Sequence, residues 1–314
     1  MNLLVAMRYL VALDKHRHFG RAAQACHITQ PALSNALRAL ETEFSVAIVK
    51  RSRTYGGLTP EGEMVLETAR RLLREAELLA QDLKAADSGP RGEIRFAAVP
   101  TAMPLLAMFA ALLQRRHPGL KPVVLAMSSP DIEAGLRDLS LDLALGYTGR
   151  SRLRSLGITT RPLYQERYYY LRRATRRASR SIRVGRGTTW AEAAAHPLCQ
   201  LTPDMHFRAI VDGALAAGRT APEPAIETNS LWTLQLAVAA GDVGAILPGA
   251  MIAAFRTHGD LEALPLVEPD IRTPVGFLSL AEARLSRAVK SALAMLETAE
   301  WTTVLERFSG ESGF

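Results

Sequence analysis

The chain has 314 residues, of which 48% are hydrophobic and 22% charged, and its formal net charge is +7. This is the composition of an ordinary soluble globular protein with enough length for two or three domains. No segment approaches the roughly 18 uninterrupted apolar residues of a membrane span, and the first twenty residues lack the charge order of a signal peptide. Two cysteines, Cys26 and Cys199, exclude a disulfide framework and a cysteine-rich zinc site. We therefore expect a cytoplasmic protein with no membrane partner.

Basic charge gathers in two parts of the chain. Residues 1–60 hold eight Lys or Arg and three acidic residues, and residues 150–186 hold twelve Arg and one Glu. Residues 61–90, in contrast, carry a net charge of −3. A polyanion is the partner that such basic clusters favour.

Short helices are predicted at the N-terminus. Apolar residues recur at three- and four-residue spacing over 3–11, and a shorter apolar face follows over 19–26. A third helix is expected from Gln30 to about residue 41, because Thr29 is a typical N-cap and Pro31 in the first turn costs no hydrogen bond. Its leucines at 33, 37 and 40 share one face and leave a polar face outside. Two glycines in the polar stretch 50–57 favour a hairpin tip, so a β-wing is predicted there.

One long helix is predicted over residues 60–87, with Pro60 at its start and acidic residues in its first turn. Its apolar residues at 65, 69, 72, 76, 79, 83 and 86 follow a heptad pattern. A lone helix about 40 Å long gains little from such a stripe. A second copy of the same helix is the expected partner, and packing on the chain's own C-terminal domain is the alternative.

From residue 92 onward, strand and helix patterns alternate. Such alternation predicts parallel βαβ units and an α/β fold in two similar lobes. The expected strands are 94–99, 123–127, 141–147, 198–201, 226–228 and 243–247, and the expected helices are 105–116, 132–139, 207–217, 231–240 and 251–258.

The two expected lobes are interleaved in the sequence. The chain is predicted to cross between them near 164–170 and to return near 274–280, just before the last helix. The first lobe thus covers about 90–163 and 275–314, and the second about 164–274. Two lobes with a gap bind ligands between them, because strand ends and helix N-termini face the gap.

The first three helices suit DNA recognition. The second helix of a helix-turn-helix fits the major groove, where Gln and Asn bind adenine and Arg binds guanine or phosphate. The wing is expected to contact the DNA backbone, which sets the register without reading bases. A short helical bundle with a polar outer face is the alternative. The predicted DNA-binding residues are Thr29, Gln30, Pro31, Ser34, Asn35, Arg38, Arg51, Arg53 and Thr54.

Several spaced blocks in the first sixty residues form a specific pattern. They are Phe19-Gly20-Arg21-Ala22-Ala23, His27-Ile28-Thr29-Gln30-Pro31-Ala32-Leu33-Ser34, Leu40-Glu41, Arg51 and Leu58-Thr59-Pro60-Glu61-Gly62. Together they resemble the N-terminal signature of the LysR-type transcriptional regulators, and the long helix and two-lobed remainder are similar to that family as well. Three positions depart from the family pattern: Asn35, Phe44 and Val49. The first concerns base preference, and the other two are variation in the core.

The resemblance implies a division of the chain into three parts. Residues 1–60 would form a winged helix-turn-helix that binds double-stranded DNA, and residues 61–89 a dimerising linker helix. Residues 90–314 would form an effector-binding domain like a periplasmic binding protein. The family usually assembles as tetramers and responds to a small inducer. We expect the effector to change the positions of lobes and subunits, and thereby DNA bending and contact with RNA polymerase.

The effector is expected at the turns that follow the strands of each lobe. By resemblance, the ligand lies near the loop after the first strand, where a hydroxyl and helix N-terminal amides can hold an anion. Plain N-capping, which Ser and Thr commonly perform, is the alternative. A small organic or inorganic anion is predicted as the ligand. The predicted effector-binding residues are Pro100, Thr101, Ala102, Ser128, Ser129, Thr202 and Asn229.

The remaining features predict no chemistry. The arginines at 172, 173, 176, 177, 180, 183 and 186 are interpreted as a solvated loop, with a second contact to DNA or to an acidic partner as the alternative. The histidines form no HxxxH or HExxH pattern, and no P-loop or GxSxG motif is present. We therefore predict no metal site, no cofactor and no enzyme activity. A solute-binding module for transport and an enzyme that uses the gap are the competing functions.

Overall fold

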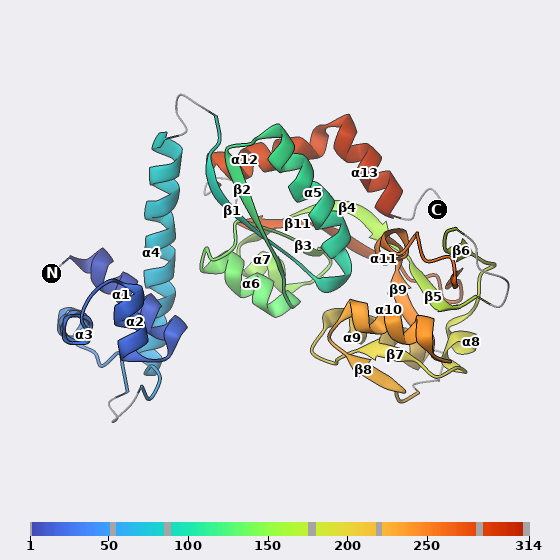
Figure 1. The fold of residues 1–314 in the computed structure, drawn as a ribbon, viewed down its shortest axis with the longest axis horizontal. Helices are drawn as coiled ribbons and strands as arrows, with labels where there is room; N and C mark the ends of the chain where they lie inside the picture. The colour runs from blue at the N-terminus through green and yellow to red at the C-terminus, as the bar shows by residue number, and fades with distance from the viewer. Residues whose placement is uncertain are drawn as a thin grey trace. The chain divides into compact units, whose positions relative to one another are not determined.

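The computed structural model describes residues 2–50, 55–84, 89–174, 180–217, 222–280 and 285–309. Contacts divide the chain into two compact units: Met1–Ser88 with Arg137–Ser140, and Gly89–Leu136 with Leu141–Phe314 (Figure 1). Among the helices of these described parts, none has the length and apolar character needed to cross a bilayer.

Three helices around one apolar core begin the first unit. They are α1 (Leu3–His16), α2 (Phe19–Ala25) and α3 (Gln30–Phe44). The side chains of Asn2, His18 and Thr29 accept backbone N–H groups of the first turn and so cap the three helices. The predicted third helix extends to Phe44, because the chain leaves it only at Ser45, whose φ is 53°. Core side chains that are fully shielded from solvent include Leu10, Leu13, Ala22, Leu33 and Leu40.

The two sides of the predicted wing are paired. Val49 and Leu58 form an antiparallel bridge, and the Lys50 N–H donates to the Gly57 carbonyl at 3.0 Å. The tip, residues 51–54, lies outside the described residues. Three predicted backbone contacts, Arg51, Arg53 and Thr54, fall in that tip.

Helix α4 (Pro60–Lys84) does not present its heptad stripe as one continuous surface. Ala69 is fully buried, and Val65 and Leu72 pack against the core that α1, α2 and α3 share. Leu79 and Leu83 are 62% and 70% exposed. The prediction that the whole apolar stripe of α4 packs against a second copy of the helix is therefore wrong for the first half of the stripe, because α1 already covers that half. Residue 86 lies outside the described part of the chain.

The first lobe of the second unit is built on a five-stranded sheet in the order β2-β1-β3-β11-β4 (Figure 1). Strand β1 is parallel to β2 and β3, whereas β11 is antiparallel to β3 and β4. The strands are β1 (Gly92–Ala98), β2 (Leu120–Ala126), β3 (Leu143–Tyr147), β4 (Ile158–Glu166) and β11 (Thr273–Leu280). The helices of this lobe are η1 (Pro100–Ala102), α5 (Met103–Arg116), α6 (Ser129–Arg137), α7 (Arg152–Ser155), α12 (Arg287–Ala294), η3 (Met295–Glu297) and α13 (Ala299–Ser309).

The second lobe holds a four-stranded sheet in the order β6-β10-β5-β9 and a two-stranded parallel sheet, β7-β8. A parallel bridge between Leu198 and Gly244 links the chain segments before β7 and β9. The strands are β5 (Tyr168–Arg173), β6 (Arg183–Val184), β7 (Cys199–Leu201), β8 (Ile226–Thr228), β9 (Ala245–Pro248) and β10 (Leu261–Pro265). The helices are α8 (Trp190–Ala194), α9 (His206–Ala217), α10 (Leu231–Ala240) and α11 (Gly249–Ala254).

The expected series of parallel βαβ units is incomplete. Strands β4, β5, β6, β10 and β11 and helices α7 and α8 were not predicted, and β5 pairs antiparallel with both β9 and β10. Antiparallel strands need no helix between them, so the alternation of strand and helix patterns does not reveal them. The predicted helix 251–258 begins at Gly249 and ends at Ala254, and the single last helix is two helices, α12 and α13.

The chain passes between the lobes twice. Strand β4 ends at Glu166 in the first sheet and β5 begins at Tyr168 in the second, so the first crossing is at Arg167. The return lies between Pro265, which ends β10, and Thr273, which begins β11. The two crossings are tied together, because the hydroxyls of Tyr168 and Thr273 share a 2.6 Å hydrogen bond.

Candidate functional site

The predicted recognition helix presents its polar face to solvent. Gln30, Asn35 and Arg38 are exposed on α3, whereas Leu33, Leu37 and Leu40 hold the opposite face in the core. Thr29 accepts the Ala32 N–H at 3.4 Å and thereby sets the start of the helix. A helix fixed from behind in this way can enter a major groove with its outer face free.

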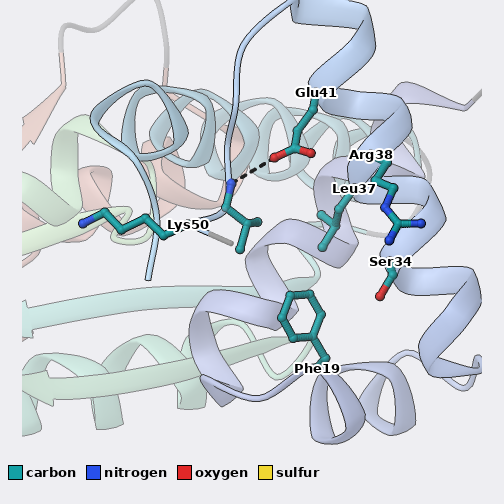
Figure 2. Close-up of a pocket in the computed structure, with 7 residues that line it drawn as sticks. Phe19, Ser34, Leu37, Arg38, Glu41 and Lys50 are labelled. Atoms are coloured by element: carbon teal, nitrogen blue, oxygen red, sulfur yellow. Dashed lines mark hydrogen bonds between the residues drawn. The ribbon is translucent and has the colours of Figure 1, made fainter. Parts of the chain in front are cut away.

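A groove of about 300 Å³ lies between α3 and the strand that enters the wing (Figure 2). Ser34 and Arg38 come from the helix, Lys50 comes from the strand, and the Phe19 ring lies at one end of the groove. A concave surface with cationic groups on both sides suits a sugar-phosphate chain. Lys50 was not predicted as a DNA-binding residue, although its position directly before the wing could have indicated it.

Glu41 joins the recognition helix to the wing. Its Oε1 accepts the backbone N–H groups of Ile48 at 2.8 Å and Val49 at 3.1 Å, as Figure 2 shows for one of them. These bonds fix the strand that carries Lys50 relative to the helix that carries Arg38. Glu41 therefore positions two cationic residues, and it lines the groove together with them.

The turn into α4 explains the block Leu58-Thr59-Pro60-Glu61-Gly62. The Thr59 hydroxyl accepts the Gly62 N–H at 2.9 Å and so caps α4. A Cβ at Gly62 would lie 2.1 Å from the Ile48 carbonyl oxygen. Close approach of α4 to the wing strand therefore requires glycine at this position.

The first predicted effector group, Thr101, is engaged inside the lobe. Thr101 is 1% exposed, and its hydroxyl forms a 3.2 Å hydrogen bond with the Tyr147 hydroxyl. The alternative of plain N-capping does not hold for Thr101, because Ala102 precedes α5 and no side chain caps that helix. The neighbouring Pro100 and Ala102 form the short helix η1 with it.

Ser128 and Ser129 have different roles after β2. Ser128 accepts the Asp131 N–H at 3.3 Å, which is the plain capping role. Ser129 is 5% exposed, and its buried hydroxyl has no hydrogen-bond partner among the described residues. A buried hydroxyl without a partner is costly, so Ser129 is the better candidate for a ligand contact.

The second lobe shows the same division. The Thr202 hydroxyl is buried and also lacks a partner within the part of the chain that the structure describes. Asn229 is exposed, and the residue that caps α10 is Ser230, which accepts the Thr233 N–H at 3.2 Å. Of the seven predicted effector residues, Ser129 and Thr202 thus have a free hydroxyl after the strands of the two lobes.

Tyr147 and His206 join the two lobes. Their rings lie 5.0 Å apart, edge to face, and His206 begins α9. Burial lowers the pKa of His206, as does the nearby Arg150, while Glu133 opposes them. Glu133 itself is 3% exposed, accepts a hydrogen bond from Arg150 Nε at 2.7 Å and forms an ion pair with Arg152 at 3.0 Å. Sequence spacing gave no signal for Tyr147 and His206 because they come from different lobes.

The arginine run is partly built into the second lobe. Arg172 on β5 forms an ion pair with Glu262 on β10 at 3.0 Å, and Arg183 lies in β6. Arg173, Arg180 and Arg186 are exposed, and residues 176 and 177 lie outside the described part of the chain. The interpretation as a loop is thus wrong for Arg172, Arg173 and Arg183, because β5 and β6 pair with β10.

Neither cysteine has the surroundings of a reactive thiol. Burial raises the pKa of Cys26, at the end of α2, and of Cys199, in β7. The two residues belong to different units. In the described parts of the chain, no three His, Cys, Asp or Glu side chains gather as metal ligands would.

Comparison with known proteins identifies both units. Residues 4–63 match the family described as "Bacterial regulatory helix-turn-helix protein, lysR family", and residues 87–300 match the "LysR substrate binding domain". The DNA-binding transcriptional dual regulator OxyR of Escherichia coli K12 is 27% identical over 281 residues, which cover 87% of each chain. An SDS degradation transcriptional activation protein from a Pseudomonas strain is 37% identical over 122 residues, which cover 38% of this chain and 40% of that protein.

Solved structures of full-length regulators have the same fold. A full-length OxyR from Pseudomonas aeruginosa with a cysteine substitution has a TM-score of 0.70, with 26% identity and 96% of each chain covered. CbnR in complex with its target DNA has a TM-score of 0.67 at 20% identity, with 96% of this chain and 99% of CbnR covered. The comparisons confirm the predicted family, the fold class and a regulator rather than a transport module or an enzyme.

Proposed function

The chain belongs to the LysR family of bacterial transcriptional regulators, and we propose that each of its three predicted parts has one function of such a regulator. Residues 1–60 bind double-stranded DNA, residues 61–89 pair two subunits, and residues 90–314 bind a small effector. The exposed polar face of α3, held from behind by three buried leucines, is the observation that carries the DNA-binding role. A regulator of this kind works on the chromosome, so we place the protein in the cytoplasm.

The groove between α3 and the wing strand supports a division between base and backbone contacts. Gln30, Asn35 and Arg38 on the helix are proposed to read base edges, and Thr29, Pro31 and Ser34 lie beside them. Lys50 and the predicted wing residues Arg51, Arg53 and Thr54 are proposed to contact phosphates.

Binding to the promoter region upstream of the protein's own gene tests this proposal. A footprint is expected in gel-shift and protection assays, and no footprint at any protein concentration would contradict it. Lys50→Ala should reduce the slope of log affinity against log salt by about 0.9, which corresponds to one lost phosphate contact. Lys121→Ala is the matched control, because it removes the same charge from an exposed position of the second unit and should leave the slope unchanged.

Pairing of two subunits is proposed through the second half of α4. Leu79 and Leu83 are large apolar side chains exposed on the helix, and Ala76 continues the same stripe. Such a stripe is stabilised by a second copy. Leu79→Glu should convert the assembly to monomers in sedimentation velocity, whereas Met64→Glu, in the half of α4 that begins at the wing, should not. By resemblance to the family we further propose a tetramer built from such dimers.

The effector is proposed to be a small anion that uses the Ser129 and Thr202 hydroxyls. Both are buried, lack a partner among the described residues and follow strands in the two lobes. Phosphate, sulfate, acetate and benzoate are suitable probes in thermal-shift measurements on the full chain. A ligand at a hundredfold excess over its Kd stabilises by about 2.7 kcal/mol. The shift should disappear in a Ser129→Ala, Thr202→Ala double variant, and an equal shift in that variant would contradict the proposed site.

Several relatives are named for peroxide-inducible activation, and we do not propose that chemistry for this chain. Thiols that sense oxidants have a low pKa and an accessible position. Burial raises the pKa of both Cys26 and Cys199. Effector binding is instead proposed to move the lobes and subunits, and so to alter DNA bending and contact with RNA polymerase.

A further inference from the structure

A carboxyl group without a charged partner lies where the chain passes between the lobes. Glu166 is the last residue of β4 and is 1% exposed. Its register partner on the neighbouring strand is Thr273, the first residue of the returning strand β11. The first crossing thus begins at Glu166, and the second ends beside it.

Side chains from both sheets enclose this carboxyl group. The Tyr164 hydroxyl donates to Glu166 Oε1 at 3.4 Å, and Oε2 has no partner among the described residues. Burial raises the pKa of the Tyr147 hydroxyl from β3 and the Tyr168 hydroxyl from β5, and both lie near enough for a charge on Glu166 to raise it further. Tyr168 belongs to the second lobe, so the enclosure depends on the present arrangement of the two sheets.

The charged groups near this point shift the pKa values of residues other than Glu166. Burial raises the pKa of Tyr169, and Arg167 opposes that shift. The hydrogen bond from Arg272 lowers the pKa of Asp270, and Arg167 lowers it further. The His206 ring of α9, which contacts Tyr147, has a pKa that burial and Arg150 lower and Glu133 raises. In the described parts of the chain, Glu166 forms no ion pair. Its negative form would therefore be buried without compensation, and burial raises the pKa of Glu166 to about 8.

We propose that Glu166 is a proton-sensitive positioning residue for the movement of the two lobes. Its carboxyl group is neutral in the arrangement of the sheets described above, and it releases its proton when the lobes separate and water reaches it. The proposal rests on the proposed function because effector control requires the lobes to move. The pH dependence of lobe separation, however, can be measured on the protein without effector or DNA.

The size of the effect follows from the two states of the carboxyl group. A hydrated Glu has a pKa of about 4.3, and the enclosed group has a pKa of about 8. Between these values the enclosed arrangement holds one more proton. The ratio of the enclosed to the separated arrangement therefore falls by about tenfold for each pH unit.

Distances between the lobes of the full chain test the proposal directly. Spin labels at Ser155→Cys in α7 and Ala209→Cys in α9, both exposed positions, report one lobe each. The background carries Cys26→Ser, and labelled subunits are diluted with unlabelled ones so that distances within one chain are measured by pulsed EPR. We expect one distance population at pH 6 and a growing, longer population at pH 8.

Three variants separate a proton switch from a purely structural role. Glu166→Gln keeps the size of the side chain without the titration, and should give the same distances at both pH values. Glu262→Gln, whose carboxylate has Arg172 as a partner, should respond to pH as the wild type does. Tyr164→Phe removes a hydrogen bond that lowers the pKa of Glu166, and should extend the pH response to higher pH.

Two results would overturn the proposal. One is a wild-type distance distribution that is identical at pH 6 and pH 8, and the other is a Glu166→Gln variant that responds to pH like the wild type. If Glu166→Gln does not fold, the Tyr164→Phe variant decides the question: its longer population should keep growing above the pH at which that of the wild type levels off, and the same upper limit in both proteins rejects the proposal. The gel-shift assay for the proposed function is independent, because it can fail while the pH-dependent distances remain.

Discussion

The first unit and the two-lobed unit place their candidate residues in opposite ways. On α3, Gln30, Asn35 and Arg38 lie on one helix whose buried leucines decide which side faces outward. In the second unit, Ser129, Thr202 and Glu166 come from separate elements: Ser129 follows β2 and Glu166 ends β4 at opposite edges of one sheet, and Thr202 follows β7 in another sheet. The contrast teaches that a site on one helix follows from local periodicity, whereas a site between lobes depends on chain crossings.

The largest effect is expected at the lobe crossing, from Glu166→Gln. The folded protein holds the Glu166 proton up to about pH 8, whereas the unfolded chain releases it near pH 4.3. Below pH 4.3 both states are protonated and the carboxyl group costs nothing. As pH rises toward 8, the wild type loses about 1.4 kcal/mol of unfolding free energy per pH unit at this residue. Glu166→Gln should therefore become more stable than the wild type with rising pH in chemical denaturation.

Glu133 provides the matched comparison in the same unit. It is as buried as Glu166, but Arg150 and Arg152 pair with it. Glu133→Gln leaves these cations without their partner and should destabilise the unit by about 3 kcal/mol at neutral pH. A similar pH response in the two variants would mean that pairing does not distinguish the two acids.

A slightly smaller effect is expected in the first unit, at Gly62. Gly62→Ala places a Cβ against the Ile48 carbonyl oxygen and should destabilise the wing and the start of α4 by about 3 kcal/mol. Hydrogen exchange of peptides from residues 2–50 reports this unit separately. Gly213→Ala in α9 is the control, because its Cβ meets nothing within 4 Å and should stabilise its helix by about 1 kcal/mol.

Glu41 tests whether the wing is held from the recognition helix. Glu41→Ala removes the acceptor of two backbone N–H groups and should cost about 2 kcal/mol in the first unit. DNA affinity should fall as well, because Lys50 loses its fixed position. Glu43→Ala, at an exposed position of the same helix, should leave the stability of the unit unchanged. Equal hydrogen exchange of residues 47–50 in both variants would show that the wing is held by other contacts.

The smallest effect is expected at the cap of α3. Thr29→Ala removes the acceptor of the Ala32 N–H and should cost about 1 kcal/mol. Thr29→Ser retains a hydroxyl and should restore most of the stability. Loss of DNA binding in Thr29→Ala without a change in helix protection would assign Thr29 a direct contact instead of a cap.

Much of the first unit could be predicted from the sequence because its signals are local. Thr29 and Pro31 mark the start of α3, and its leucine spacing identifies the buried face. The role of Lys50 was missed, since the groove beside it forms only when the wing strand packs against α3. In the second unit, strands of the parallel core were predicted, but β4, β5 and β10 were not, because their antiparallel partners lie far away in the chain.

The sequence by itself determined the helix-turn-helix, the family and the presence of two α/β lobes, because caps, periodicity and spaced motifs act over a few residues. The tertiary structure decided which hydroxyls remain free, since Tyr147 engages Thr101 while Ser129 and Thr202 have no partner among the described residues. It also decided that Glu166 is buried at a crossing and that α1 covers the first half of the α4 stripe. Burial and pairing are properties of neighbours brought together by folding, and the spacing of residues along a chain does not encode them directly.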